Sequence, residues 1–339
     1  MTKTAIVLLN YNGEKILPTF LPSVVEHTPS ADADIFVIDN ASTDNSSILL
    51  KEKFPAVRVI HLDQNYGFAG GYNKGLSEID AKYYVLLNTD VEVTENWLQP
   101  LVDYMDMHED TAAVQPKILA YTKKTHFEHA GACGGFIDKW GYPLCRGRVM
   151  NITERDNGQY DETRDIFWAT GACLCIRKSD FENAGGFDSD FFAHMEEIDL
   201  CWRLKARGQK IACVPQSTVY HLGGGTLNVE NPRKTYLNFR NNLLMLYKNL
   251  PNDRLKKVFF ARFVLDNAAM AKYLLTFDIK NAKAILKARK DFREMKKNFA
   301  DKRKENQAKA TCTSFAEMTE KSVVFNFFFK GKKRFCDYF

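Results

Sequence analysis

Residues 83–90 have the sequence Tyr-Tyr-Val-Leu-Leu-Asn-Thr-Asp, an apolar run that ends abruptly at Asn88 and Asp90. A short apolar run between polar residues predicts a strand that is buried on both faces of a sheet. In open α/β sheets, ligands bind at the carboxyl ends of such strands. A carboxylate there is well placed to hold a metal ion that carries a substrate phosphate, although a lone Asp more often caps the next helix.

Strands and helices alternate on both sides of this run. Apolar segments predict strands at residues 4–9, 34–38, 57–62, 83–88 and 112–118. The segments between them predict helices that end near residues 27, 53, 79 and 108. This alternation predicts right-handed βαβ units and therefore an α/β fold with a mostly parallel, Rossmann-like central sheet.

Polar side chains follow four of these strands directly. Asn10, Asp39 and Asn65 come after the first three, and Asn88 with Asp90 after the fourth. Because the carboxyl ends of parallel strands share one edge of a sheet, we expect these side chains to converge on one site.

The second half of the chain changes character. The glycine-rich segment 121–165 predicts loops or an antiparallel insertion over the site, and Tyr220–Thr226 predicts a glycine-rich loop. Further elements are expected as strands at 165–176 and 210–214 and as helices at 179–184, 196–207, 236–249, 255–277 and 279–304. We therefore predict two regions, a catalytic domain at 1–250 and a helical C-terminal region at 251–339.

Charge separates the two regions further. Residues 1–240 carry 24 Lys+Arg and 32 Asp+Glu, whereas residues 241–339 carry 23 and 10. Basic helices with apolar faces are typical of proteins that lie on an anionic membrane, and the Phe- and Lys-rich end strengthens this interpretation. The alternative is that these faces pack on the catalytic domain or on a second subunit. No DNA-reading module is visible, so we expect no nucleic-acid partner.

The cysteines indicate a cellular location. The eight cysteines show no C-x-x-C spacing, and several lie in apolar runs. This usage favours a reducing cytosol. The N-terminus has no signal-peptide pattern, and no apolar stretch reaches 18 residues. We therefore expect a cytoplasmic protein, with the inner face of the cell membrane as its site of action if the tail binds lipid.

Two common nucleotide-binding motifs are absent. The first strand is not followed by G-x-G-x-x-G, which counts against a dinucleotide-dependent dehydrogenase, and no G-x-x-x-x-G-K-[ST] sequence is present. An Asp after the fourth strand suits a complex of a divalent metal with a nucleoside diphosphate instead.

Five segments in order resemble family 2 inverting glycosyltransferases of the GT-A fold, nearest to the rhamnosyltransferase-like branch that builds surface polysaccharides. They are VLLNYN at 7–12, VIDNASTDNS at 37–46, NYGFAGGYNKG at 65–75, LLNTDVEV at 86–93 and TGACLCIRKSDFENAGGFDSDFFAHMEEIDLCWRLKARG at 170–208. The resemblance covers about residues 4–245. It implies transfer of a sugar from a nucleotide-diphosphate donor to a hydroxyl of a glycan or lipid-linked acceptor, with Mn²⁺ or Mg²⁺ as cofactor.

The resemblance implies how the donor is held. Asp39 matches the family Asp that contacts the base of the nucleotide. The other positions matched to the nucleotide, the sugar or the diphosphate are Asn10, Tyr11, Asn12, Asn65, Gly67, Asn88 and Arg240. An Arg suits the diphosphate because its fork meets phosphate oxygens bidentately. Gly67 would let the donor approach closely, while Gly70 and Gly71 serve either that approach or tight helix packing.

The resemblance also implies the metal ligands and the base. Asp90 matches the metal ligand, and His221 a residue that completes the metal or diphosphate site. An inverting transfer needs one base to take the proton of the acceptor hydroxyl. The acidic cluster of the family places this base at Glu197, with Glu196 as the alternative.

The acceptor side matches a further set of positions, namely Trp168, Thr170, Gly171 and Asp199. Asp199 can also pair with Arg203 one helical turn later.

Two other functions stay open. A sugar-phosphate nucleotidyltransferase would have a glycine-rich triphosphate loop with a basic residue after its first strand, which Asn10–Gly13 and Glu14 do not supply. A non-catalytic nucleotide-sugar-binding protein could keep the same fold.

Overall fold

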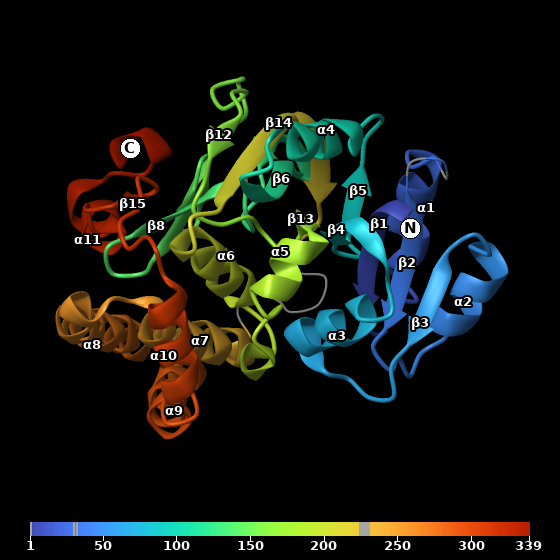
Figure 1. The fold of residues 1–339 in the computed structure, drawn as a ribbon. Helices are drawn as coiled ribbons and strands as arrows, with labels where there is room; N and C mark the ends of the chain where they lie inside the picture. Colours follow the sequence, from blue (N-terminus) through green and yellow to red (C-terminus); the bar gives the residue numbers. More distant parts are fainter. Residues whose placement is uncertain (1, 30, 32, 224–230) are drawn as a thin grey trace.

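The computed structural model describes residues 2–29, 31, 33–223 and 231–339 (Figure 1). The first four strands of the main sheet are β1 (Thr2–Asn10), β2 (Asp34–Asp39), β3 (Arg58–His61) and β4 (Ala81–Leu87). They run parallel in the order β4-β1-β2-β3. Helices α1 (Leu17–Glu26), α2 (Ser46–Lys53) and α3 (Gly67–Leu76) connect them, so the predicted α/β architecture is confirmed.

The run that ends at Asp90 is a central strand. In β4, Tyr84 and Leu86 belong to the core on one face of the sheet, whereas Tyr83, Val85 and Leu87 belong to the core on the other. All five side chains are at most 1% exposed. The prediction of a strand buried on both faces is confirmed.

Beyond β4 the sheet is mixed. After the short β5 (Val91–Val93) and α4 (Gln99–Met107), β6 (Thr111–Ala120) runs parallel to β14 (Lys210–His221). Between β4 and β6 lies β13 (Cys173–Arg177), which is antiparallel to both. This mixed half forms because the chain returns through an insertion rather than through another βαβ unit.

The glycines of α3 settle one alternative left open above, because a Cβ on Gly71 would lie 2.8 Å from Leu9 and one on Gly75 would lie 2.1 Å from Ile38. These glycines therefore serve close packing of the helix on the sheet.

Three predicted boundaries need correction. The strand expected at 165–176 is divided into β12 (Arg164–Asp165) and β13, with a buried irregular stretch between them.

The other two corrections concern β14 and the tail. β14 continues to His221, so only part of the expected loop at 220–226 remains, and Gly224–Thr226 lie outside the described residues. The single helix expected at 279–304 is α9 (Ile279–Met295) followed by α10 (Ala300–Lys309). The break places Phe299 in the core against Phe191, with 6.0 Å between the ring centroids.

Of the two alternatives expected for segment 121–165, the structure shows the antiparallel insertion. β7 (Lys123–Phe127) pairs with β6. The strands β8 (Gly135–Asp138), β9 (Pro143–Cys145), β10 (Arg148–Val149) and β11 (Ile152–Thr153) form a second sheet. Its fifth strand, β15 (Met318–Thr319), comes from the C-terminal region and runs parallel to β8.

The C-terminal helices lie on the side of the molecule opposite β1–β3 (Figure 1). They are α7 (Pro232–Asn249), α8 (Asn252–Leu275), α9, α10 and α11 (Val323–Lys330). Phe292, Phe299 and Val323 share the core of the sheet domain, so part of the basic tail packs on that domain. The division at residue 250 stays a prediction. Among the helices that the structure describes, none is both long and apolar enough to cross a bilayer.

Candidate active site

The ends of β1 and β2 are joined by their polar side chains. Asn10 Nδ2 donates to Asp39 Oδ1 at 3.2 Å, and both residues are buried. Asp39 Oδ2 also accepts from Ser47 Oγ at 3.1 Å. The predicted convergence at the carboxyl edge is therefore present for these two strands, while the expected contact of Asp39 with a nucleotide base stays a prediction.

Two residues that were not predicted as part of the site connect its loops. Asn40 Nδ2 donates to Asn65 Oδ1 at 3.1 Å and to the Gly67 carbonyl at 3.0 Å. Ser42 Oγ accepts from the Asn12 amide at 2.9 Å. Both lie in the polar run after β2, so their position in the sequence was a signal for them. Tyr11 in the first loop is 43% exposed.

Asp90 lies against His221, 131 positions later in the chain. Residues 91 and 221 are register partners in β5 and β14, which brings the imidazole beside the end of β4. His221 Nε2 is 3.1 Å from Asp90 Oδ1 and 3.5 Å from Asn88 Nδ2. Asn88, Asp90 and His221, which were predicted for the metal and the sugar, therefore lie together at the end of β4.

Glu128, which was not predicted, lies on the other side of the imidazole. Its Oε2 is 3.2 Å from His221 Nδ1, and both side chains are buried. Burial lowers the pKa of His221, but the bonds to Asp90 and Glu128 outweigh this and raise it to about 10. Glu128 follows β7 in the insertion, which contains none of the sequence segments that resemble the family. No motif therefore indicated it.

The donor set at this point fits a divalent cation. A carboxylate oxygen and the nitrogen of a neutral imidazole both bind Mn²⁺, so the ion would have to replace a proton on His221. Mg²⁺ takes one or two carboxylates and completes its shell with water and phosphate oxygens. A carboxylate on the second ring nitrogen is the usual support of a metal-binding His. Within residues 2–223 and 231–339, apart from residues 30 and 32, no group of three or more His, Cys, Asp or Glu side chains could hold a metal by itself. Asp90 and His221 would therefore share the ion with a ligand.

The two candidate bases lie at the start of α6 (Glu196–Ala206). Glu196 is buried and Glu197 half-buried, and Oε2 of each has no hydrogen-bond partner among the described residues. Burial raises the pKa of Glu197 to about 7. Burial and the neighbouring Glu197 charge raise the pKa of Glu196 well above its ordinary value. A carboxylate with a pKa near neutrality is suited to general base catalysis.

The segment before α6 has an unusual backbone. Phe192, His194 and Met195 all have positive φ angles (66°, 71° and 75°), a region that costs non-glycine residues of order 1–3 kcal/mol each. Asn241 Nδ2 holds it by donating to the carbonyls of Phe191, Ala193 and His194 at 2.7–2.9 Å. The pair at 240–241 thus holds the turn that presents the bases.

Arg240 and Gly67 also face this segment. The Arg240 guanidinium donates to the carbonyls of Asp190 and Phe191 at 3.2 and 3.0 Å. A Cβ on Gly67 would lie 2.7 Å from the Phe192 carbonyl oxygen. Both residues thus contact the turn before α6, and their expected contacts with the diphosphate and the donor stay predictions.

The residues predicted for the acceptor side lie in different surroundings. Ala172 O accepts from the Asn88 amide at 3.0 Å, so the 170–172 stretch lies beside the end of β4. Trp168 is buried and donates from Nε1 to the Phe136 carbonyl at 2.9 Å, so it supports the wall of the insertion. A Cβ added to Gly171 would lie 3.0 Å from the Phe68 ring. Thr170 is buried.

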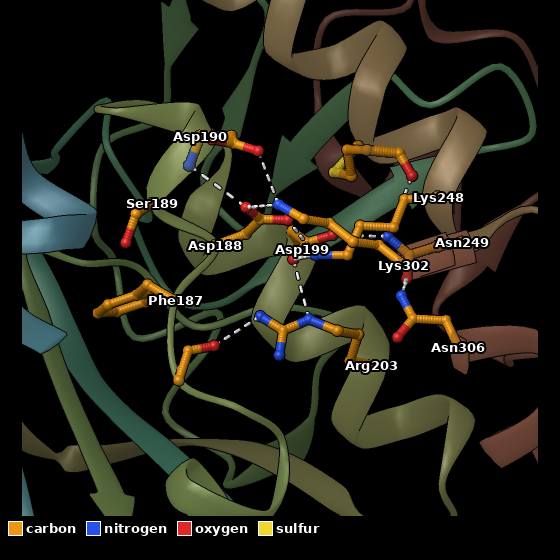
Figure 2. A network of polar contacts seen from close by, with 12 residues as sticks. Phe187, Asp188, Ser189, Asp190, Asp199, Arg203, Lys248, Asn249, Lys302 and Asn306 are labelled. Carbon is orange, nitrogen blue, oxygen red and sulfur yellow. Dashed lines mark hydrogen bonds and ion pairs between the residues drawn. The ribbon is translucent and has the colours of Figure 1, made fainter. Parts of the chain in front are cut away.

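Asp199 lies in the interior of the protein. It is 0% exposed and is bonded to Arg203, Lys248 and Asn249 at 2.8–2.9 Å. Figure 2 shows Lys248 from α7 and Lys302 from α10 reaching the same acidic cluster. The pair predicted between Asp199 and Arg203 is confirmed, but it is part of a buried network that ties α6 to the C-terminal helices.

Comparisons with known proteins agree with this geometry. The glycosyl transferase family 2 model matches residues 5–185, more than half of the chain. The O-antigen biosynthesis protein RfbC of Myxococcus xanthus is 27% identical over 65% of this chain. The low-salt glycan biosynthesis hexosyltransferase Agl10 of Haloferax volcanii is 25% identical over 71% of this chain and 74% of its own length. The chain spans only 17% of the length of RfbC.

A third relative and two solved structures extend the comparison. The N-acetylglucosaminyl-diphospho-decaprenol L-rhamnosyltransferase of Mycobacterium tuberculosis is 25% identical over 64% of this chain and 75% of its own length. A crystal structure of GalNAc-T7 with UDP, GalNAc and Mn²⁺ has a TM-score of 0.58 and 18% identity, covering 75% of this chain and 49% of that one. A crystal structure of S. aureus TarS 1-349 has a TM-score of 0.53 and 14% identity, covering 85% of this chain and 81% of that one. These structures share the GT-A fold.

Proposed function

The chain belongs to glycosyl transferase family 2, and from this premise we propose that it transfers a sugar, with inversion, from a nucleotide-diphosphate donor to a hydroxyl of a glycan or lipid-linked acceptor. The observation that carries the proposal is the pairing of Asp90 with His221 at the end of β4. It places a metal-competent donor set where ligands bind in α/β sheets.

The nucleotide occupies the edge formed by Asn10, Asp39 and the loop at Asn65. Asp39 accepts from the base, and Asn88 contacts the sugar or ribose. When bound at Asp90 and His221, Mn²⁺ or Mg²⁺ neutralises charge on the diphosphate leaving group. Glu128 keeps the imidazole oriented by holding Nδ1.

Glu197 takes the proton of the acceptor hydroxyl. The hydroxyl oxygen then forms its bond to the anomeric carbon from the face opposite the diphosphate, and the bond to the diphosphate oxygen breaks with its electron pair. The transition state is oxocarbenium-like, as in glycoside hydrolysis. The unpartnered Oε2 of Glu197 and its raised pKa support this role.

The named relatives narrow the acceptor. One of them is named for rhamnosyl transfer to a diphospho-decaprenol carrier and another for O-antigen biosynthesis. We therefore favour a carrier-lipid-linked glycan as acceptor, in surface polysaccharide synthesis at the inner face of the cell membrane.

Calorimetric titration tests the site. UDP, GDP and dTDP are titrated into the wild-type chain and into Asp90→Ala, each with and without Mn²⁺. We expect at least one nucleotide to bind the wild-type chain with a clear Mn²⁺ dependence, which Asp90→Ala abolishes. Binding that is equal with and without Mn²⁺ would contradict the assignment of Asp90.

A further inference from the structure

Helix α8 carries an apolar face that no other described part of the chain covers. Phe260, Val264, Ala268, Ala271 and Leu275 are spaced three or four residues apart, and all five are exposed. Side chains at this spacing lie on one face of a helix. Phe260 is 72% and Leu275 81% exposed.

A second group of exposed aromatic residues extends this face. Phe325, Phe328 and Phe329 on α11 are 48%, 52% and 77% exposed. Lys272 Nζ lies 5.4 Å from the centroid of the Phe328 ring, which places α11 beside the C-terminal end of α8. We call the five α8 residues and these three phenylalanines the α8–α11 face. Both helices lie on the same side of the molecule in Figure 1.

The charge around the α8–α11 face is predominantly positive. Between residues 254 and 277 the only acidic residue is Asp266, which is 1% exposed and paired with Arg262 at 3.2 Å. The exposed cations that flank the face are Lys256, Lys257, Lys272, Lys330, Lys332, Lys333 and Arg334. They outnumber the exposed acids near α8, which are Asp253 in its first turn and Glu320, 4.0 Å from Arg254. A contiguous apolar surface with a polar rim marks an interaction site.

We propose that the α8–α11 face docks on the surface of a bilayer that contains anionic phospholipid. An amphipathic helix with basic flanks lies in the interface plane, with its apolar side chains below the headgroups and its lysines among them. A second copy of the chain is the weaker occupant, because its own basic rim would meet this one. The docking surface is independent of the proposed reaction, but its value for reaching a lipid-linked acceptor rests on the proposed function.

Vesicle flotation of the full chain tests the docking. Phosphatidylglycerol–phosphatidylcholine vesicles are compared with pure phosphatidylcholine vesicles at low and high salt. We expect the partition coefficient to be at least about tenfold higher on the anionic vesicles, and to fall with salt. The double variant Leu275→Glu, Phe329→Glu should have a partition coefficient on the anionic vesicles about tenfold or more below that of the wild-type chain.

A matched control separates the face from general surface apolarity. Met107→Glu changes a side chain on α4 that is also 72% exposed, and it should bind like the wild-type chain. Equal melting temperatures would show that the variants are folded. Failure of the wild-type chain to float, or an equal loss in Met107→Glu, would overturn the proposal.

Two further readouts complete the test. A stable dimer in sedimentation that the double variant converts to monomer would overturn the proposal by assigning the face to a second copy. Calorimetry of nucleotide diphosphate binding keeps the two proposals distinguishable. The double variant should bind nucleotide normally, whereas a wild-type chain that floats but binds no nucleotide would support the docking and contradict the proposed function.

Discussion

The residues proposed to bind the nucleotide (the nucleotide side) and the turn and helix that carry Glu197 (the base side) differ in how far apart in the sequence their contacting residues lie. Asn10 and Asp39 are 29 positions apart, and each directly ends one of two neighbouring parallel strands. Glu197 depends on a turn whose carbonyls are held by Asn241, 47 to 50 positions later, and on a helix tied to Lys248. The nucleotide side thus follows from strand topology, whereas the base side requires the C-terminal helices to be in place.

The difference predicts separable effects. Changes on the base side should lower the rate or the stability and leave nucleotide affinity intact, while changes at the metal should act on binding. The four predictions below test this separation, beginning with the largest effect.

Glu197→Gln should lower sugar transfer by about a thousandfold, within the range for loss of a general base, and leave nucleotide diphosphate affinity unchanged. The amide keeps the shape of the side chain but cannot accept the proton. Single-turnover kinetics measures the rate of sugar transfer, and calorimetry measures the affinity for nucleotide diphosphate. Glu196→Gln is the matched control, and a larger loss there would move the base by one residue.

Lys248→Met should destabilise the fold by about 3 kcal/mol, because it removes the ammonium group between the buried carboxylates of Asp188 and Asp199. Urea denaturation measures the loss. Lys302→Met removes a cation that is more exposed from the same cluster and should cost only about 1 kcal/mol. If both variants lost the same stability, the buried network would not be what holds α6.

Glu128→Gln should weaken Mn²⁺ binding in the presence of nucleotide diphosphate by about tenfold, the lower end for loss of a group that orients a metal-binding His. The rate at saturating metal should change little. Calorimetry with Mn²⁺ as titrant measures the affinity, and Glu92→Gln on the adjacent β5 is the control. Unchanged affinity would remove Glu128 from the site.

The rate should also depend on the protonation of Glu197. Its pKa is raised to about 7, and only the deprotonated form accepts a proton. At saturating Mn²⁺ and donor, the rate should therefore fall about tenfold per pH unit below this value and level off above it. A profile that is flat from pH 5 to pH 8 would contradict Glu197 as the base.

Much of the sheet could be predicted because its signals are local. The apolar runs predicted β1, β2 and β4 to within one or two residues at either end, and the polar residues that end them lie at the expected edge. The start of α6 at Glu196 and its end before Gly208 were also predicted.

The errors involve contacts between distant parts of the chain. Phe299 interrupts an otherwise helical pattern because its side chain fills the core beside Phe191. Asp199 has the spacing of an exposed helical pair with Arg203 but meets Lys248 and Asn249 in the interior. Glu128 carries no motif and is identified only by its distance to His221.

The sequence by itself therefore determined the family, the parallel strands and the edge at which Asn10, Asp39 and Asp90 gather, since periodicity and strand ends are properties of neighbouring residues. Only the tertiary structure decided that Arg240 contacts the turn before α6, that Asp199 lies in a buried network, that Glu128 lies against His221, and that the described part of the chain leaves an apolar face of α8 uncovered. Each of these depends on which distant side chain reaches a given atom, and residue spacing along the chain does not contain that information.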